Sequence, residues 1–103
     1  MARSYSAEFL QELANTQSDS VGIALARVCV EANIPASYVA VALETSRMTI
    51  HGWFRGQEIR KSKHKLIEVF IDLVKKDLKD GILPAENHED AKEYIQDMLG
   101  IKI

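Results

Sequence analysis

The chain has 103 residues, of which 47% are hydrophobic and 27% are charged, and its formal net charge is −2; this length suits one small domain with a single core. No window approaches the roughly 18 uninterrupted apolar residues that span a bilayer, and the first residues lack the apolar region of a signal peptide, so we expect a cytoplasmic protein without a membrane partner. A single cysteine excludes an intrachain disulfide, and the three histidines show no metal-ligand spacing. Because a glycine-rich phosphate loop and a nucleophile elbow are also absent, the sequence predicts no enzyme, no metal and no cofactor.

Two amphipathic helices are predicted in the first third of the chain. One spans about residues 6–14, and the next begins after the capping cluster Ser18-Asp19-Ser20 and ends at Asn33. Cys29 falls on the apolar face of the second helix, which predicts a buried thiol rather than a reactive one. The inward-facing side chains would be Phe9, Leu10 and Leu13, then Val21, Leu25, Val28 and Ala32.

Residues 35–56 predict two short helices separated by a tight turn. Pro35 suits a helix start, Thr45 or Ser46 would cap the second helix, and Gly56 would end it in a left-handed conformation. The apolar positions are Val39, Ala40 and Leu43 in the first helix and Ile50, Trp53 and Phe54 in the second. The opposite face of the second helix would carry Arg47, Met48, Thr49, His51 and Arg55.

Two further helices complete an all-α chain, because no segment alternates apolar and polar residues for long enough to predict a strand. The fifth helix follows Ser62 and closes at Asp80-Gly81, while the last begins near Asn87 and stops at Gly100. Their apolar side chains would be Leu66, Phe70, Leu73, Val74 and Leu78, then Ala91, Tyr94, Ile95, Met98 and Leu99.

A family resemblance lies in residues 46–56, which read Ser46-Arg47-Met48-Thr49-Ile50-His51-Gly52-Trp53-Phe54-Arg55-Gly56. This run resembles the helix-turn-helix of the Cro and phage-repressor (XRE-type) DNA-binding family, whose motif reads Ser-Arg-x-Thr-Ile-x-x-Trp-x-x-Gly, and the flanking helices extend the resemblance to residues 20–79. The resemblance implies an all-α, compact helix-turn-helix bundle of about five helices plus a C-terminal amphipathic helix. It also implies a sequence-specific DNA-binding transcriptional regulator of the phage-repressor type.

Two positions depart from this family's pattern. Glu44 stands where the turn often has glycine, and a left-handed conformation there would cost about 1 kcal/mol. Gly52 stands where the family often has a long polar side chain that adds a base contact. The sequence therefore predicts a strained turn and one missing contact.

By this resemblance, the helix at residues 46–55 would lie in the major groove of double-stranded DNA. Arg47 would donate two hydrogen bonds to a guanine, and Met48 or Thr49 would touch a thymine methyl. The base-contacting candidates are Arg47, Met48, Thr49 and His51. The phosphate-contacting candidates are Ser37, Arg55, Arg60, Lys61 and Lys63.

Positive charge is concentrated in one segment although the whole chain is slightly acidic. Residues 1–46 carry two basic and five acidic side chains, residues 47–65 carry six and one, and residues 66–103 carry five and nine. Such a run alone is typical of a solvated helix face, but beside the motif it predicts phosphate contacts.

The C-terminal segment leaves alternatives open, because a helix-turn-helix domain over residues 1–80 is complete before the short connection and helix at residues 81–103. The apolar face of that helix would pack on its own core or on a second copy. In the second case Tyr94, Ile95, Met98 and Leu99 are dimerisation residues. We expect a homodimer, because two-fold proteins read half-sites about one DNA turn (~34 Å) apart. The alternative functions are a DNA-binding assembly or packaging component like a small terminase subunit, an antitoxin, or a scaffold that binds a protein partner through the C-terminal helix.

Overall fold

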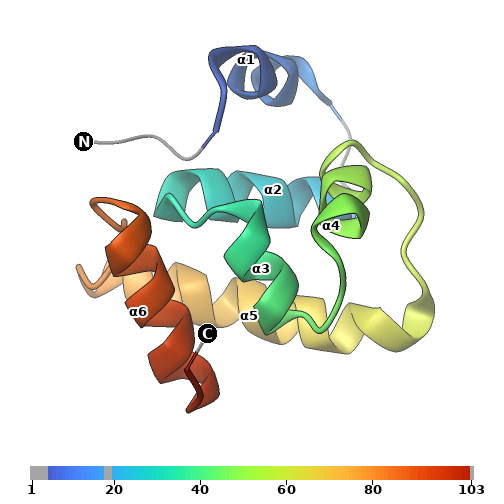
Figure 1. Ribbon diagram of the computed structural model, residues 1–103. Helices are drawn as coiled ribbons and strands as arrows, with labels where there is room; N and C mark the ends of the chain where they lie inside the picture. Colours follow the sequence, from blue (N-terminus) through green and yellow to red (C-terminus); the bar gives the residue numbers. More distant parts are fainter. Residues whose placement is uncertain (1–4, 18–19, 103) are drawn as a thin grey trace.

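The computed structural model describes residues 5–17 and 20–102, and every regular element within these ranges is an α-helix, which confirms the predicted all-α class. The elements are α1 (Ala7–Asn15), α2 (Val21–Ala32), α3 (Ala36–Ala42), α4 (Arg47–Phe54), α5 (Lys61–Lys79) and α6 (His88–Leu99). In Figure 1, α3 lies between α4 and α6, while α2 and α5 run behind these three helices and pack on each other. The helix α1 lies over α2, away from α5.

Side-chain caps set the starts of four helices, close to the predicted positions. In α4 the hydroxyl oxygen of Ser46 accepts a hydrogen bond from the backbone N–H of Thr49, at 3.1 Å. Such a cap typically contributes about 1 kcal/mol, because it satisfies a backbone donor that the helix cannot pair. Ser18 and Asp19 of the predicted capping cluster lie outside the described residues. The four capping residues are Ser6, Ser20, Ser46 and Asn87.

The turn between α3 and α4 keeps a left-handed residue without glycine. Glu44 has φ 56°, and the N–H of Thr45 donates to the carbonyl of Ala40 at 3.0 Å, which closes the end of α3. A left-handed conformation places Cβ close to the following carbonyl oxygen, so this glutamate carries strain of about 1 kcal/mol. The strain predicted at this position is therefore present.

Gly22 allows the backbones of α2 and α4 to approach closely. A Cβ at this position would lie 3.0 Å from the carbonyl carbon of Trp53, nearer still to its oxygen, and 3.4 Å from Cδ1 of Ile59. Across this contact α4 buries the three apolar side chains that the sequence assigned to its inner face, which are Ile50, Trp53 and Phe54.

The buried stripe of α5 differs in part from the prediction. The sequence predicts an inward-facing Leu73, but this side chain is 38% exposed, whereas Ile67 and Ile71 lie in the core. Apolar residues cover more than one face of this helix, and contact with α2 selects the stripe that is buried. The helix also begins at Lys61 and includes Ser62, after which the sequence predicts its start. In α2, Val21 is predicted to be buried but is only half-buried.

The C-terminal helix α6 packs on its own chain, against α3. Ile95 is fully buried, and the hydroxyl of Tyr94 donates a hydrogen bond to a carboxylate oxygen of Asp77 in α5. The connection before α6 is held by two reciprocal bonds, from the N–H of Ala85 to the carbonyl of Ala32 (2.9 Å) and from Nδ2 of Asn33 to the carbonyl of Ala85 (2.8 Å). Of the two alternatives for this apolar face, the chain's own core is the one the structure shows.

Candidate nucleic-acid interface

The outer face of α4 gathers three of the four predicted base-contacting residues. Arg47, Met48 and His51 are all exposed, and Met48 keeps 84% of its surface in contact with solvent. A large apolar side chain so exposed at a helix start has no packing role, since the core side of the same helix is filled by other residues. The arrangement presents one guanidinium, one thioether and one imidazole on a single face.

Thr49, the fourth candidate, is turned toward the helix start. Its hydroxyl oxygen accepts a hydrogen bond from the hydroxyl of Ser46 at 2.9 Å, and its backbone N–H donates to the same Ser46 oxygen. The side chain is half-buried. Thr49 therefore stabilises the cap of α4 and lies less openly on the outer face than its neighbours.

His51 lies between two arginines on the same face of α4, one turn from each. Partial burial lowers the pKa of its imidazole, and the positive charges of Arg55 and Arg47 lower it further. The neutral imidazole, which can both donate and accept a hydrogen bond, is therefore favoured over the charged form.

The end of α4 is closed by a Schellman motif. The N–H of Gly56 donates to the carbonyl of Trp53 and the N–H of Gln57 to the carbonyl of Gly52, both at 3.0 Å. Gly56 has φ 93°, a conformation that side chains strongly disfavour. This reversal brings Gln57 back over the outer face of α4, beside Gly52.

The basic segment that follows is divided between solvent and the core. Arg60, Lys61 and Lys65 are exposed, while Lys63 is half-buried and its Nζ donates a hydrogen bond to the carbonyl of Leu43 at 3.3 Å. Lys63 thus ties the start of α5 to the end of α3. Its ammonium group keeps further donors, but its position is fixed by this contact.

Basic side chains lie at the start of α5, although the N-terminus of a helix favours negative charge. Its first turn has no acidic residue, and its N-cap, Arg60, makes no side-chain capping bond. The N-terminus of a helix carries a partial positive charge, so basic side chains there are unfavourable by a few tenths of a kcal/mol each. By contrast, α6 has Glu89 and Asp90 in its first turn. The basic segment is therefore locally unfavourable unless an anion binds.

Ser37 is exposed in the first turn of α3, as a phosphate contact requires. Beside it, the rings of Tyr38 and His88 meet edge to face with centroids 6.5 Å apart, so the acidic first turn of α6 flanks the start of α3. This edge of the candidate surface is therefore less favourable to phosphate than the segment after α4.

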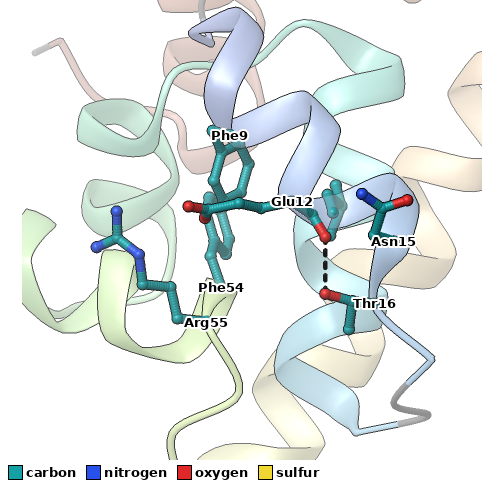
Figure 2. A pocket seen from close by; sticks show the side chains of 7 residues that line it. Phe9, Glu12, Asn15, Thr16, Phe54 and Arg55 are labelled. Atoms are coloured by element: carbon teal, nitrogen blue, oxygen red, sulfur yellow. Dashed lines mark hydrogen bonds between the residues drawn. The ribbon is translucent and has the colours of Figure 1, made fainter.

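A groove of about 550 Å³ lies between α1 and the end of α4. Aromatic rings join these helices, because the rings of Phe9 and Phe54 meet at an interplanar angle of 32° with their centroids 5.9 Å apart. Figure 2 shows the side chain of Glu12 extended toward Arg55 across this groove. Arg55, a predicted phosphate contact, therefore has an acidic neighbour on one side.

The predicted dimerisation residues belong to the core of their own chain. Ile95 is fully buried, Tyr94 is hydrogen-bonded to Asp77, and Met98 and Leu99 are half-buried against the same core. The side chain of Ile95 is thus inaccessible to a second copy. Large apolar side chains exposed elsewhere are Met48, Val69, Leu73, Ile82 and Ile101.

Comparison with family models, curated proteins and solved structures finds no match for this chain. Among the described residues, no group of three or more histidine, cysteine, aspartate or glutamate side chains is placed to hold a metal ion. In the same part of the chain, no single helix is long and apolar enough to span a membrane. Together α2 and α3 reach the length and hydropathy of a membrane span, but the chain bends by 119° between them.

Proposed function

We propose that this protein is a sequence-specific DNA-binding transcriptional regulator that places α4 in the major groove. The observation that carries this proposal is the division of α4 into two faces. Three apolar side chains anchor the inner face, while Arg47, Met48 and His51 stand exposed on the outer one. A recognition helix needs this arrangement, because its base-reading side chains must be free while its axis is held firmly.

Charge supports the same proposal. Exposed basic side chains follow the outer face of α4 in the sequence, although the chain as a whole has a net charge of −2. They are Arg55, Arg60, Lys61 and Lys65. Phosphate oxygens would relieve the unfavourable placement of these cations at the start of α5.

Two kinds of contact follow for individual residues. Arg47, at the first position of α4, can donate two hydrogen bonds to the O6 and N7 atoms of guanine. Lys61 would contact a phosphate, and such a contact carries no sequence information. In the same proposal Met48 meets a thymine methyl, and Ser37, Arg55 and Arg60 contact the DNA backbone.

The experiment that tests this proposal is fluorescence anisotropy of the purified protein with a labelled duplex between about 50 and 200 mM salt. Four phosphate contacts predict a slope of log affinity against log salt of about −4. Arg47→Ala should lower affinity for a preferred site by about 1–3 kcal/mol and flatten sequence discrimination, whereas Lys61→Ala should weaken binding to all sequences alike. Absence of binding at the lowest salt would refute DNA recognition and favour a scaffold that binds a protein.

A homodimer is part of the proposal, since two-fold proteins read paired half-sites. Ile95 is fully buried, so of the predicted dimerisation residues the half-buried Tyr94, Met98 and Leu99 would make the contact on α6. Two apolar side chains one turn apart on α5 are also exposed and could contact a second copy: Val69 (52% exposed) and Leu73 (38% exposed). Sedimentation at micromolar concentration that gives only the 11.6 kDa species would contradict the dimer.

A further inference from the structure

The outer face of α4 contains a notch at Gly52. Residues four apart lie above one another on a helix, so Gly52 shares its stripe with Met48, the most exposed large apolar residue of the described chain. Because glycine has no side chain, α4 itself presents no side chain on this face one turn after Met48.

The side chain of Gln57 fills this notch. A Cβ built on Gly52 would lie 2.9 Å from Cδ of Gln57 and nearer still to its Oε1, so the carboxamide occupies the place that a side chain at 52 would take. Gln57 arrives there because Gly56 reverses the chain and the N–H of Gln57 bonds to the carbonyl of Gly52 at 3.0 Å. The position is therefore set by the backbone as well as by the side chain.

From this placement we infer that Gln57 is a specificity-determining residue, whose carboxamide reads an A·T base pair from the notch at Gly52. This inference rests on the proposed function, since it concerns a contact within the same DNA surface. A glutamine carboxamide carries one acceptor and two donors, which match the N6 amino group and the N7 atom of adenine in the major groove.

The arrangement replaces a contact from the helix with one from the loop after it. Gln57 is exposed, so its amide keeps hydrogen-bonding capacity for a ligand. Its neighbours on the α4 surface supply different chemistry, because Arg47 is suited to guanine and Met48 to a methyl group. Gln57 thus adds adenine recognition to a face that otherwise lacks a carboxamide.

The test begins with selection of preferred duplexes from a random-sequence DNA library by the wild-type protein, Gln57→Ala, Arg47→Ala and the control Gln11→Ala. Gln11 is an exposed glutamine on α1, outside the candidate surface. Anisotropy titrations then measure each protein against the selected duplex and against duplexes altered at one base pair. Thermal melting confirms that each variant is folded.

Gln57→Ala should lose about 5- to 100-fold discrimination at a single A·T pair while it keeps the preference that Arg47→Ala removes. Gln11→Ala should behave as the wild type. A double variant, Gly52→Gln with Gln57→Ala, returns the carboxamide to the helix and should restore preference at the same pair. Failure of the double variant to do so would overturn the assignment of the notch.

Two other results would overturn the inference. If Gln57→Ala binds all duplexes more weakly by the same factor, Gln57 contacts a phosphate. If its affinity and base preference are unchanged, Gln57 lies outside the interface. In either case the wild type still selects a site that depends on Arg47, so the proposed function survives. A wild-type protein that binds no duplex overturns both.

Discussion

The two helical glycines of this chain offer a direct test of its packing, because replacing each by alanine should destabilise the protein at Gly22 but not at Gly52. In Gly22→Ala the new Cβ meets the backbone of α4, at 3.0 Å from the carbonyl carbon of Trp53. In Gly52→Ala the new Cβ meets only the far end of the Gln57 side chain. Backbone atoms of a packed helix cannot move aside without displacing the core, whereas a flexible side chain can rotate into solvent.

The magnitudes follow from two opposing contributions. Alanine favours a helix over glycine by at most about 1 kcal/mol, and both glycines lie near a helix end, where this gain is smaller. Forcing an extra methyl group into a packed contact costs about 1–3 kcal/mol. Gly22→Ala should therefore lower the free energy of unfolding by about 1–2 kcal/mol, while Gly52→Ala should leave it unchanged or raise it by up to about 1 kcal/mol.

Urea denaturation followed by circular dichroism measures both variants on one scale. The slope of free energy against urea should stay constant, so that a shift in midpoint reports stability alone. Thermal midpoints should separate by about 4–8 °C for each kcal/mol of difference. Equal midpoints for the two variants, or a Gly22→Ala protein more stable than the wild type, would refute the close approach of α2 and α4.

Three further predictions concern single residues. Glu44→Gly should stabilise the fold by up to about 1 kcal/mol in the same denaturation assay, because glycine removes the left-handed strain at φ 56°; a loss of stability would contradict that strain. His51 has a lowered pKa in the folded protein, so the folded state binds fewer protons than the unfolded chain. The contribution of His51 to the free energy of unfolding should be complete above the unfolded pKa of about 6.5 and should be lost as pH falls below it. The wild type should therefore lose more stability than His51→Gln over this pH range. Equal pH profiles for the wild type and His51→Gln would contradict the lowered pKa of His51. Burial raises the pKa of the Cys29 thiol, which is fully buried, so a thiol reagent should modify it only at the rate of unfolding; rapid modification of the native protein would show that the core opens there.

Local chemistry made much of the helical architecture predictable. Ser46 caps α4 and Gly100 ends α6, as their residue types indicate, because caps and left-handed stops depend on the backbone within a few residues. The inner face of α4 was also predictable, since its short helix has a single apolar stripe that contains Ile50 and Trp53.

Longer apolar helices were harder to interpret from sequence. In α5 the apolar residues occupy more than one stripe, and the structure buries Ile71 where the periodicity favours Leu73 for the core. Periodicity shows that a helix has apolar faces but does not show which neighbour covers each of them. For the same reason the sequence left open whether α6 would pack on its own chain.

Six helices, most of their ends and the segregation of positive charge after α4 could be predicted from the sequence alone, since these depend on neighbours in the chain. Only the tertiary structure decided that α6 covers α3, that Lys63 holds the end of α3, and that the carboxamide of Gln57 occupies the notch at Gly52. Each of these contacts joins groups from separate helices or from a helix and the loop that folds back on it. Their positions follow from the packing of the whole chain, which no local pattern of residues specifies.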